Sequence, residues 1–158
     1  KKYLSKPVNH KWPLSLDDLI FVIDTFASSN TYDDILFVTM LITSFNTLQR
    51  LGELVWPDAL KHQSYQKIPL HHILKITNNS ASYTFPYQKN SSLGSGCVIL
   101  LLAEDGACIN PLVTLNQYVS VCNQQFPHHP QIWLTAWGIT PTRAWFMRYL
   151  CRFFLPAI

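Results

Sequence analysis

The residues from Tyr32 to about Leu48 constrain the fold most, because they are apolar on most sides of the helix that their spacing predicts. Thr31 can cap this helix, and Asp33 and Asp34 in its first turn suit the positive end of the helix dipole. A helix that is hydrophobic nearly all round needs to be buried. The sequence therefore predicts a domain built around one central helix.

A second helix is expected directly before the central one. Ser15 can cap it, with Asp17 and Asp18 in its first turn. Apolar residues then recur at helical spacing as far as about Ser28. The link at residues 28–30 is short, which predicts an antiparallel pair of helices.

The character of the sequence changes after Pro57. Three short strands are predicted, at residues 67–77, 81–85 and 97–102. Two more helices are predicted, from Asn110-Pro111 to about Phe126 and from Thr140-Pro141 to about Phe154. This order predicts an α+β fold in which helices pack around a small three-stranded antiparallel sheet.

The composition excludes a disordered chain. The 158 residues fit one domain, and 48% of them are hydrophobic and 13% aromatic. Charged residues make up only 13%, against roughly a quarter in typical soluble domains. We therefore expect part of the surface to be buried against a partner, a second copy or a segment outside this chain.

No metal, cofactor or membrane span is expected. The four cysteines lack the paired spacing of metal and redox motifs, which predicts reduced thiols in an intracellular protein. The histidine pairs at 71–72 and 128–129 do not make a metal site by themselves, because neighbours on a strand point to opposite faces. The longest nearly apolar stretch, residues 35–45, is too short to cross a bilayer.

The net charge of +3 is unevenly distributed. Residues 1–11 contain four lysines and no acid, so residues 1–14 are interpreted as a basic extended arm, and Pro7 and Pro13 exclude helix there. Residues 12–49 contain five aspartates and no base. By itself this charge pattern favours nucleic acid only weakly.

Arg50 is the most unusual charged residue, because it directly follows the apolar helix in a turn that contains Gly52. Two interpretations stay open. The guanidinium can pair internally with Glu53, or it can bind an external phosphate. Lys89 lies in a polar segment between the second and third predicted strands, where a lysine is either solvated or functional.

Six strings carry a family resemblance in the right order along nearly the whole chain: residues 6–14 (KPVNHKWPL), 33–37 (DDILF), 48–54 (LQRLGEL), 85–89 (FPYQK), 130–135 (PQIWLT) and 141–146 (PTRAWF). Together they resemble the tyrosine recombinase, or DNA breaking-rejoining enzyme, superfamily. More narrowly, they are similar to the recombinase-like group that is abundant in basidiomycete fungi. Residues 15–158 then correspond to a partial catalytic domain of that family.

The resemblance implies that the protein functions in DNA recombination and integration. It also implies that this chemistry needs no cofactor. In that family a tyrosine attacks a DNA phosphate, two arginines hold the non-bridging oxygens, and a lysine protonates the leaving oxygen. By motif, Arg50 corresponds to the first arginine, Glu53 to its support and Lys89 to the general acid. On either side of this lysine, Gln88 and the residues Asn90-Ser91-Ser92 depart from the family pattern.

The family pattern continues with Gly-His-x-x-Arg, Gly-Arg-Trp and the tyrosine nucleophile, for which this chain has no counterpart. Tyr149 is interpreted as packed core and not as a substitute nucleophile, because it lies among Trp145, Phe146 and Leu150. We therefore expect a chain that is catalytically incomplete, a pseudoenzyme by itself. Loss of the later helices should expose apolar surface, which predicts a homo-oligomer, formed for example by exchange of the last helix.

Duplex DNA is the expected partner, with a nuclear location. Besides Arg50 and Lys89, five basic side chains are candidates for DNA contacts: Lys61, Lys67, Lys75, Arg148 and Arg152. The alternative is a non-enzymatic interaction or self-associating module that descends from a recombinase and no longer binds DNA. The low number of basic residues favours that alternative.

Overall fold

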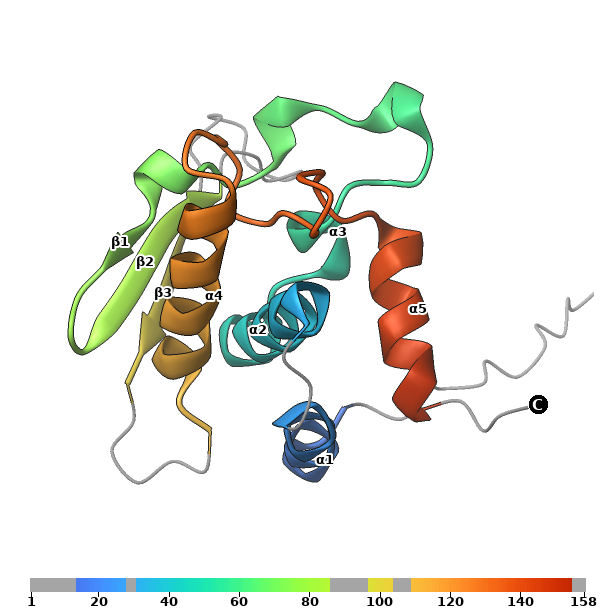
Figure 1. The fold of residues 1–158 in the computed structure, drawn as a ribbon, viewed down its shortest axis with the longest axis vertical. Helices are drawn as coiled ribbons and strands as arrows, with labels where there is room; N and C mark the ends of the chain where they lie inside the picture. The colour runs from blue at the N-terminus through green and yellow to red at the C-terminus, as the bar shows by residue number, and fades with distance from the viewer. Residues whose placement is uncertain (1–13, 28–30, 86–96, 104–108, 155–158) are drawn as a thin grey trace, which may run out of the picture.

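The computed structural model describes residues 14–27, 31–85, 97–103 and 109–154 (Figure 1). The first two elements are helices with capped N-termini. In α1 (Leu16–Ala27), the amide of Asp18 donates to Ser15 Oγ at 3.2 Å, and the Asp18 carboxylate accepts from the Ser15 amide at 2.8 Å. In α2 (Tyr32–Thr47), Thr31 Oγ1 accepts from the Asp34 amide at 3.3 Å. Both predicted helix starts are confirmed.

The remaining elements of the described residues follow the predicted order: α3 (Leu51–Leu54), β1 (Lys75–Ile76), β2 (Ser80–Phe85), β3 (Cys97–Leu102), α4 (Pro111–Gln125) and α5 (Arg143–Phe154). Three short 3₁₀ turns precede β1, at Leu60–His62, Tyr65–Lys67 and His71–Ile73. The α+β class is confirmed. Residues 1–13 of the expected arm at 1–14 and the segment around Lys89 lie outside the described residues.

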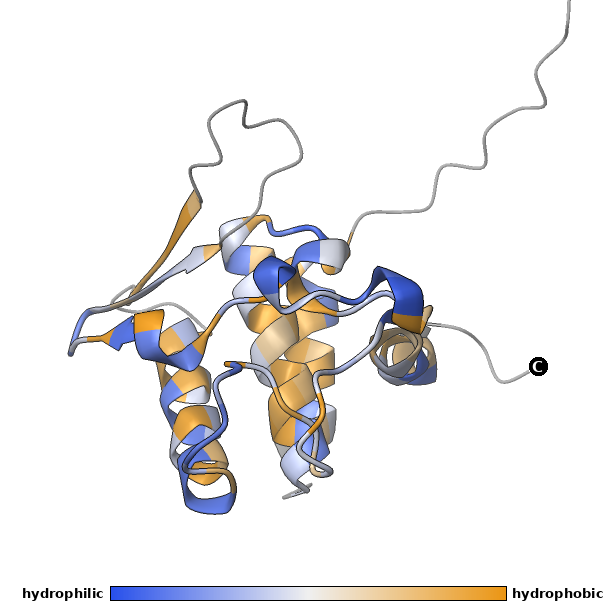
Figure 2. Ribbon diagram, turned by 90° about the horizontal axis from the view of Figure 1, so that it is seen from above, coloured by the Kyte–Doolittle hydropathy of each residue, from blue (hydrophilic) through white to orange (hydrophobic). Residues whose placement is uncertain are grey.

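The core is built around α2, as its apolar sequence predicts. Nine of its residues are buried, and Leu36, Phe37, Met40 and Ile42 have no exposed surface. Figure 2 shows the hydrophobic ribbon of α2 in the middle of the molecule. The sheet and α4 lie on one side of α2, and α5 lies on the other (Figure 1).

The three strands pair antiparallel in the order β1-β2-β3. Their inward face packs on the core through Ala81, Tyr83 and Leu101, and Ala81 is the register partner of Leu101. On the outward face, β3 presents exposed apolar side chains at every second position: Val98, Leu100 and Leu102. The sheet therefore has one covered face and one apolar stripe without a cover among the described residues.

The first strand is much shorter than predicted, because only Lys75 and Ile76 of residues 67–77 pair with β2. Pro69 lies inside this segment and has no amide hydrogen for a ladder. The backbone bonds instead to a distant loop: the His71 amide donates to Pro130 O at 2.6 Å, and the Ile132 amide donates to Pro69 O at 3.2 Å. The predicted strand at 67–74 was therefore wrong.

The two late helices are found close to their predicted positions. Pro111 opens α4, and Asn110 Oδ1 accepts from the Leu112 amide at 3.0 Å. Helix α5 begins at Arg143, slightly after the predicted Thr140-Pro141, with Thr142 Oγ1 accepting from the Trp145 amide at 3.3 Å.

Between these helices, residues 131–135 are buried, and the Tyr118 hydroxyl donates to Ile132 O and accepts from the Leu134 amide, each at 2.9 Å.

Cys97, Cys122 and Cys151 are free thiols, as expected, and Cys108 lies outside the described residues. A search of the described residues finds no helix with the length and apolar character needed to cross a membrane.

Candidate anion-binding site

Arg50 sits on a turn that is fixed at both ends. Helix α2 ends at Leu48, whose backbone is left-handed with φ of 53°, a conformation that is costly for a leucine. The next residue is anchored, because the hydroxyl of the buried Tyr83 donates to Gln49 Oε1 at 2.6 Å. Arg50 then begins α3, and its side chain is exposed.

Glu53 supports Arg50 through the backbone. Its carboxylate accepts from the Arg50 amide at 3.1 Å, and its own amide donates to Arg50 O at 2.8 Å. The structure shows no ion pair between the two side chains. The internal guanidinium-carboxylate pair, one of the two interpretations of Arg50, is therefore not formed.

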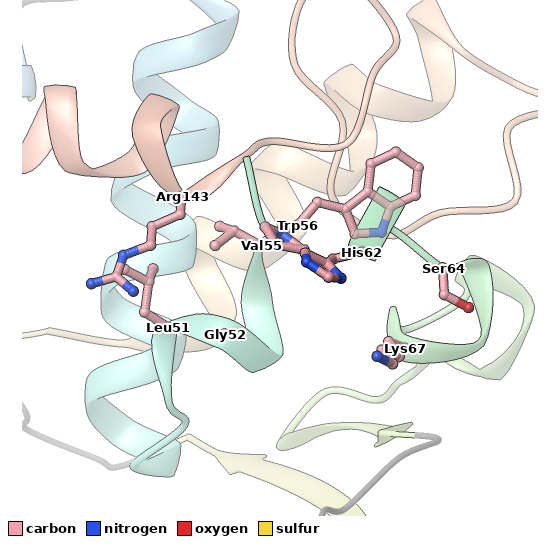
Figure 3. Close-up of a pocket in the computed structure, with 9 residues that line it drawn as sticks. Leu51, Gly52, Val55, Trp56, His62, Ser64, Lys67 and Arg143 are labelled. Carbon is pink, nitrogen blue, oxygen red and sulfur yellow. The ribbon is translucent and has the colours of Figure 1, made fainter. Parts of the chain in front are cut away.

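A pocket of about 370 Å³ lies next to this turn, and Leu51, the residue after Arg50, is part of its lining. Its lining, here called the cationic pocket, consists of Leu51, Gly52, Val55, Trp56, Pro57, His62, Ser64, Lys67 and Arg143. Figure 3 shows Arg143 on one side, Lys67 and Ser64 on the other, and Val55, Trp56 and His62 between them. All three ionisable lining residues are basic, so the pocket favours an anion.

Parts of the chain that are far apart in sequence build this pocket. The Trp56 amide donates to Pro141 O at 2.9 Å, and the Arg143 amide donates to Trp56 O at 2.8 Å. Asp58 Oδ1 accepts from the Ala144 amide at 2.7 Å and so caps α5 from a distant loop. These bonds fix the start of α5, and with it the backbone of Arg143, against the loop after α3.

Trp56 forms part of the pocket wall. Its ring packs edge-on against Tyr65, with ring centroids 5.2 Å apart. Its indole Nε1–H is buried and has no hydrogen-bond partner among the described residues. In Figure 3 the nitrogen edge of the ring is turned towards His62 and Lys67. A buried donor without a partner is costly, so this edge of the ring is held by packing and not by a hydrogen bond.

The structure brings together only some of the basic residues proposed for DNA contacts. Lys67 lines the pocket, and the exposed Lys61 directly precedes the lining residue His62. Lys75 lies instead on β1, on the opposite side of the molecule from α5 (Figure 1). Arg148 and Arg152 are exposed further along α5, where the Arg152 guanidinium lies 4.9 Å from the centre of the Tyr149 ring.

Of the residues that line the pocket, only Lys67 was proposed from the sequence as a site residue, whereas the aromatic and basic residues Trp56, His62 and Arg143 were not. Arg143 is not among the candidates for DNA contacts, and it lies off the helical row that Arg148 and Arg152 share. The available signal was the helix start at Thr140-Pro141, which places Arg143 in the first turn of α5, at the end of the helix and not along its side.

Tyr149 behaves as a packing residue, as expected. Its ring stacks on Phe37 with centroids 5.0 Å apart and lies 4.7 Å from the Trp145 ring. Burial, and next the carboxylates of Asp34 and Asp33, raise the pKa of Tyr149. A tyrosine with a raised pKa is less easily deprotonated and so is a poorer nucleophile.

Within the described residues, no group of three or more His, Cys, Asp or Glu side chains is placed to hold a metal ion. Comparison of the chain with protein-family models and with curated proteins gives no match. The functional argument therefore depends on the residues themselves.

Proposed function

We propose that this chain is a DNA-binding domain of the tyrosine-recombinase kind that contacts a backbone phosphate through Arg50. The observation that carries the proposal is the exposed guanidinium on a turn fixed by Tyr83 and Glu53. A side chain whose backbone is already held loses less freedom when it binds. The order of the family-like strings along the chain supports the same assignment.

A guanidinium suits this role because its planar fork of donors matches two oxygens of one phosphate. Lys61 and Lys67 follow Arg50 closely in the chain and would add phosphate contacts beside it. Lys89 as a general acid and a nuclear location belong to the same proposal.

The test is duplex-DNA binding at fixed low salt for the wild type, Arg50→Ala and Arg148→Ala. Both variants remove one exposed arginine, so they change the net charge equally. The proposal expects Arg50→Ala to weaken binding by about tenfold or more and Arg148→Ala by clearly less. Equal losses would mean that only net charge matters. Absence of binding by folded wild-type protein would overturn the proposal.

The outward face of β3 favours a second candidate function, a non-enzymatic interaction or self-associating module. Val98, Leu100 and Leu102 are each more than half exposed on one uncharged strand at the edge of the sheet. Sedimentation at tens of micromolar tests this candidate, with Leu100→Lys as the disrupting variant. An oligomer that Leu100→Lys dissociates would support it, and a strict monomer would contradict it.

A further inference from the structure

We propose that β3 pairs edge to edge with β3 of a second copy of this chain, antiparallel about a twofold axis at Leu100. The inference rests on the second candidate function, the self-associating module, and names the edge, the partner and the register of that contact. It stands on the backbone groups that β3 leaves free, on the side chains of the same residues, and on the difference between the two edges of the sheet.

The free backbone groups of β3 follow from its ladder with β2. The Ala103 amide donates to Asn79 O at 2.9 Å, which continues the register that pairs Leu101 with Ala81. Hydrogen-bonded and non-hydrogen-bonded positions alternate in an antiparallel pair, so the odd-numbered residues of β3 bond β2. The even-numbered residues, here called the edge residues, turn their amides and carbonyls to the open side of the strand: Val98, Leu100 and Leu102.

The ladder between β1 and β2 gives the same assignment independently. The Thr77 amide donates to Ser80 O at 2.8 Å and continues the β1–β2 register, so Ser80 bonds β1 and its neighbour Ala81 bonds β3. Among the described residues, the edge groups have one contact, a long one of 3.7 Å from the Cys97 thiol to Val98 O. A thiol is a weak donor, and a carbonyl has a second lone pair for a stronger one.

The edge residues also carry exposed apolar side chains. Val98, Leu100 and Leu102 are 65%, 55% and 56% exposed on the face of the sheet that points away from the core. Figure 2 shows β3 as hydrophobic along its whole length. Monomeric proteins protect a free edge with charged residues, proline or a short strand, whereas Cys97–Leu102 contains no charged residue and no proline.

The opposite edge of the sheet has the protection that β3 lacks. Strand β1 consists of only two residues, Lys75 and Ile76, and the Lys75 side chain is exposed. A very short strand with a lysine is a common device against strand pairing between molecules. The sheet is therefore protected at one edge and open at the other.

A second copy fits the open edge because β3 is complementary to itself. If Leu100 lies opposite Leu100 of the second copy, Val98 lies opposite Leu102 in both halves of the pair. All three edge residues then occupy hydrogen-bonded positions, and every amide and carbonyl at the edge gains a partner. Any other register places at least one edge residue opposite a position outside the strand. The facing side chains lie on one face of the combined sheet, and no charge of the strand opposes its own image.

The experiment measures amide hydrogen exchange of the full chain by ¹H–¹⁵N NMR in a dilution series. The amides of Ile99 and Leu101 should exchange slowly at every concentration, because they bond β2. The amides of the edge residues should exchange slowly in the concentrated sample and fast after dilution. Slow exchange that does not change with dilution would assign the edge to another segment of the same chain and overturn the proposal. An oligomer whose edge amides stay fast would overturn it too, while the self-associating module would stand.

Two substitutions at Leu100 distinguish edge pairing from contact between apolar faces. Leu100→Pro removes the amide that faces the edge and no amide of the ladder with β2, a position at which a strand tolerates proline. Leu100→Thr keeps that amide and removes the apolar side chain. In sedimentation, Leu100→Pro should raise the Kd of the dimer by about thirtyfold, and Leu100→Thr by less than about fivefold. Equal effects would mean that the faces associate, which would overturn the proposal.

The register has a separate readout. In a mixture of isotopically labelled and unlabelled chains, the α-hydrogen of Ile99 should show a nuclear Overhauser contact with that of Leu101 of the second copy, because these residues face each other at a non-hydrogen-bonded position. A dimer without this contact would overturn the register. If Leu100→Pro does not fold, this contact and the exchange pattern still decide. A strict monomer would contradict the self-associating module as well, whereas DNA binding through Arg50 is tested separately.

Discussion

The interior around α2 and the loop from Val55 to Lys67 differ in how their backbone is held. Helix α2 is held by its own hydrogen bonds and uses its side chains to fill the core. The loop is tied at Trp56 and Asp58 to the start of α5, and it carries basic and aromatic side chains into the pocket. Local periodicity thus specifies the core, whereas contacts between distant segments specify the site.

The largest effect is expected in the interior. Phe37 has no exposed surface and contacts the rings of Phe26, Phe146 and Tyr149, so it links three helices. Phe37→Ala should lower the free energy of unfolding by about 3–5 kcal/mol. Urea denaturation measures it, with Leu60→Ala as the control, because Leu60 is 81% exposed in the loop. If both variants lost a similar free energy of unfolding, side-chain packing around α2 would matter no more for stability than the exposed loop does.

A smaller effect is expected where the core holds an irregular segment. Tyr118→Phe removes the hydroxyl that bonds Ile132 O and the Leu134 amide and leaves a buried N–H without a partner. The free energy of unfolding should fall by about 1–3 kcal/mol. The exposed Tyr65 provides the control variant Tyr65→Phe. A neutral Tyr118→Phe would show that residues 132–134 are held by packing alone.

The predictability of the fold follows the same division. Helices α1, α2 and α4 were predicted from caps and apolar spacing, which act over a few residues. The strand expected at 67–77 failed because Pro69 and the distant Pro130 redirect its hydrogen bonds. Arg50 was recognised beside its buried helix, but the pocket was not, because nothing local indicates that Trp56 and Arg143 meet.

Loss of the hydrogen bond between the loop residue Asp58 and the start of α5 should have a moderate effect on stability. Asp58→Ala removes the acceptor of the Ala144 amide and should lower the free energy of unfolding by about 0.5–2 kcal/mol. It should also speed hydrogen exchange at Ala144. Asp58→Asn keeps an acceptor oxygen and should lose less. Unchanged exchange at Ala144 in Asp58→Ala would mean that the loop does not hold the start of α5.

The smallest effect concerns a purely local cap at the exposed start of α1. The Ser15 amide, and next its hydroxyl, lower the pKa of Asp18. A carboxyl with a lowered folded pKa adds stability above its unfolded pKa of about 3.9 and loses it as the pH falls through the folded pKa. Asp18→Asn should therefore be less stable than the wild type at pH 7 and equally stable at pH 2. A pH-independent difference in urea denaturation would contradict this.

The salt dependence of duplex-DNA binding tests the central claim most directly. Affinity for duplex DNA falls as the salt concentration rises, and each phosphate contact makes the slope of log affinity against log salt steeper by about 0.9. If Arg50 binds a phosphate, Arg50→Ala should bind more weakly and with a slope about 0.9 smaller than the wild type. An unchanged slope in a folded Arg50→Ala variant would show that Arg50 does not contact DNA.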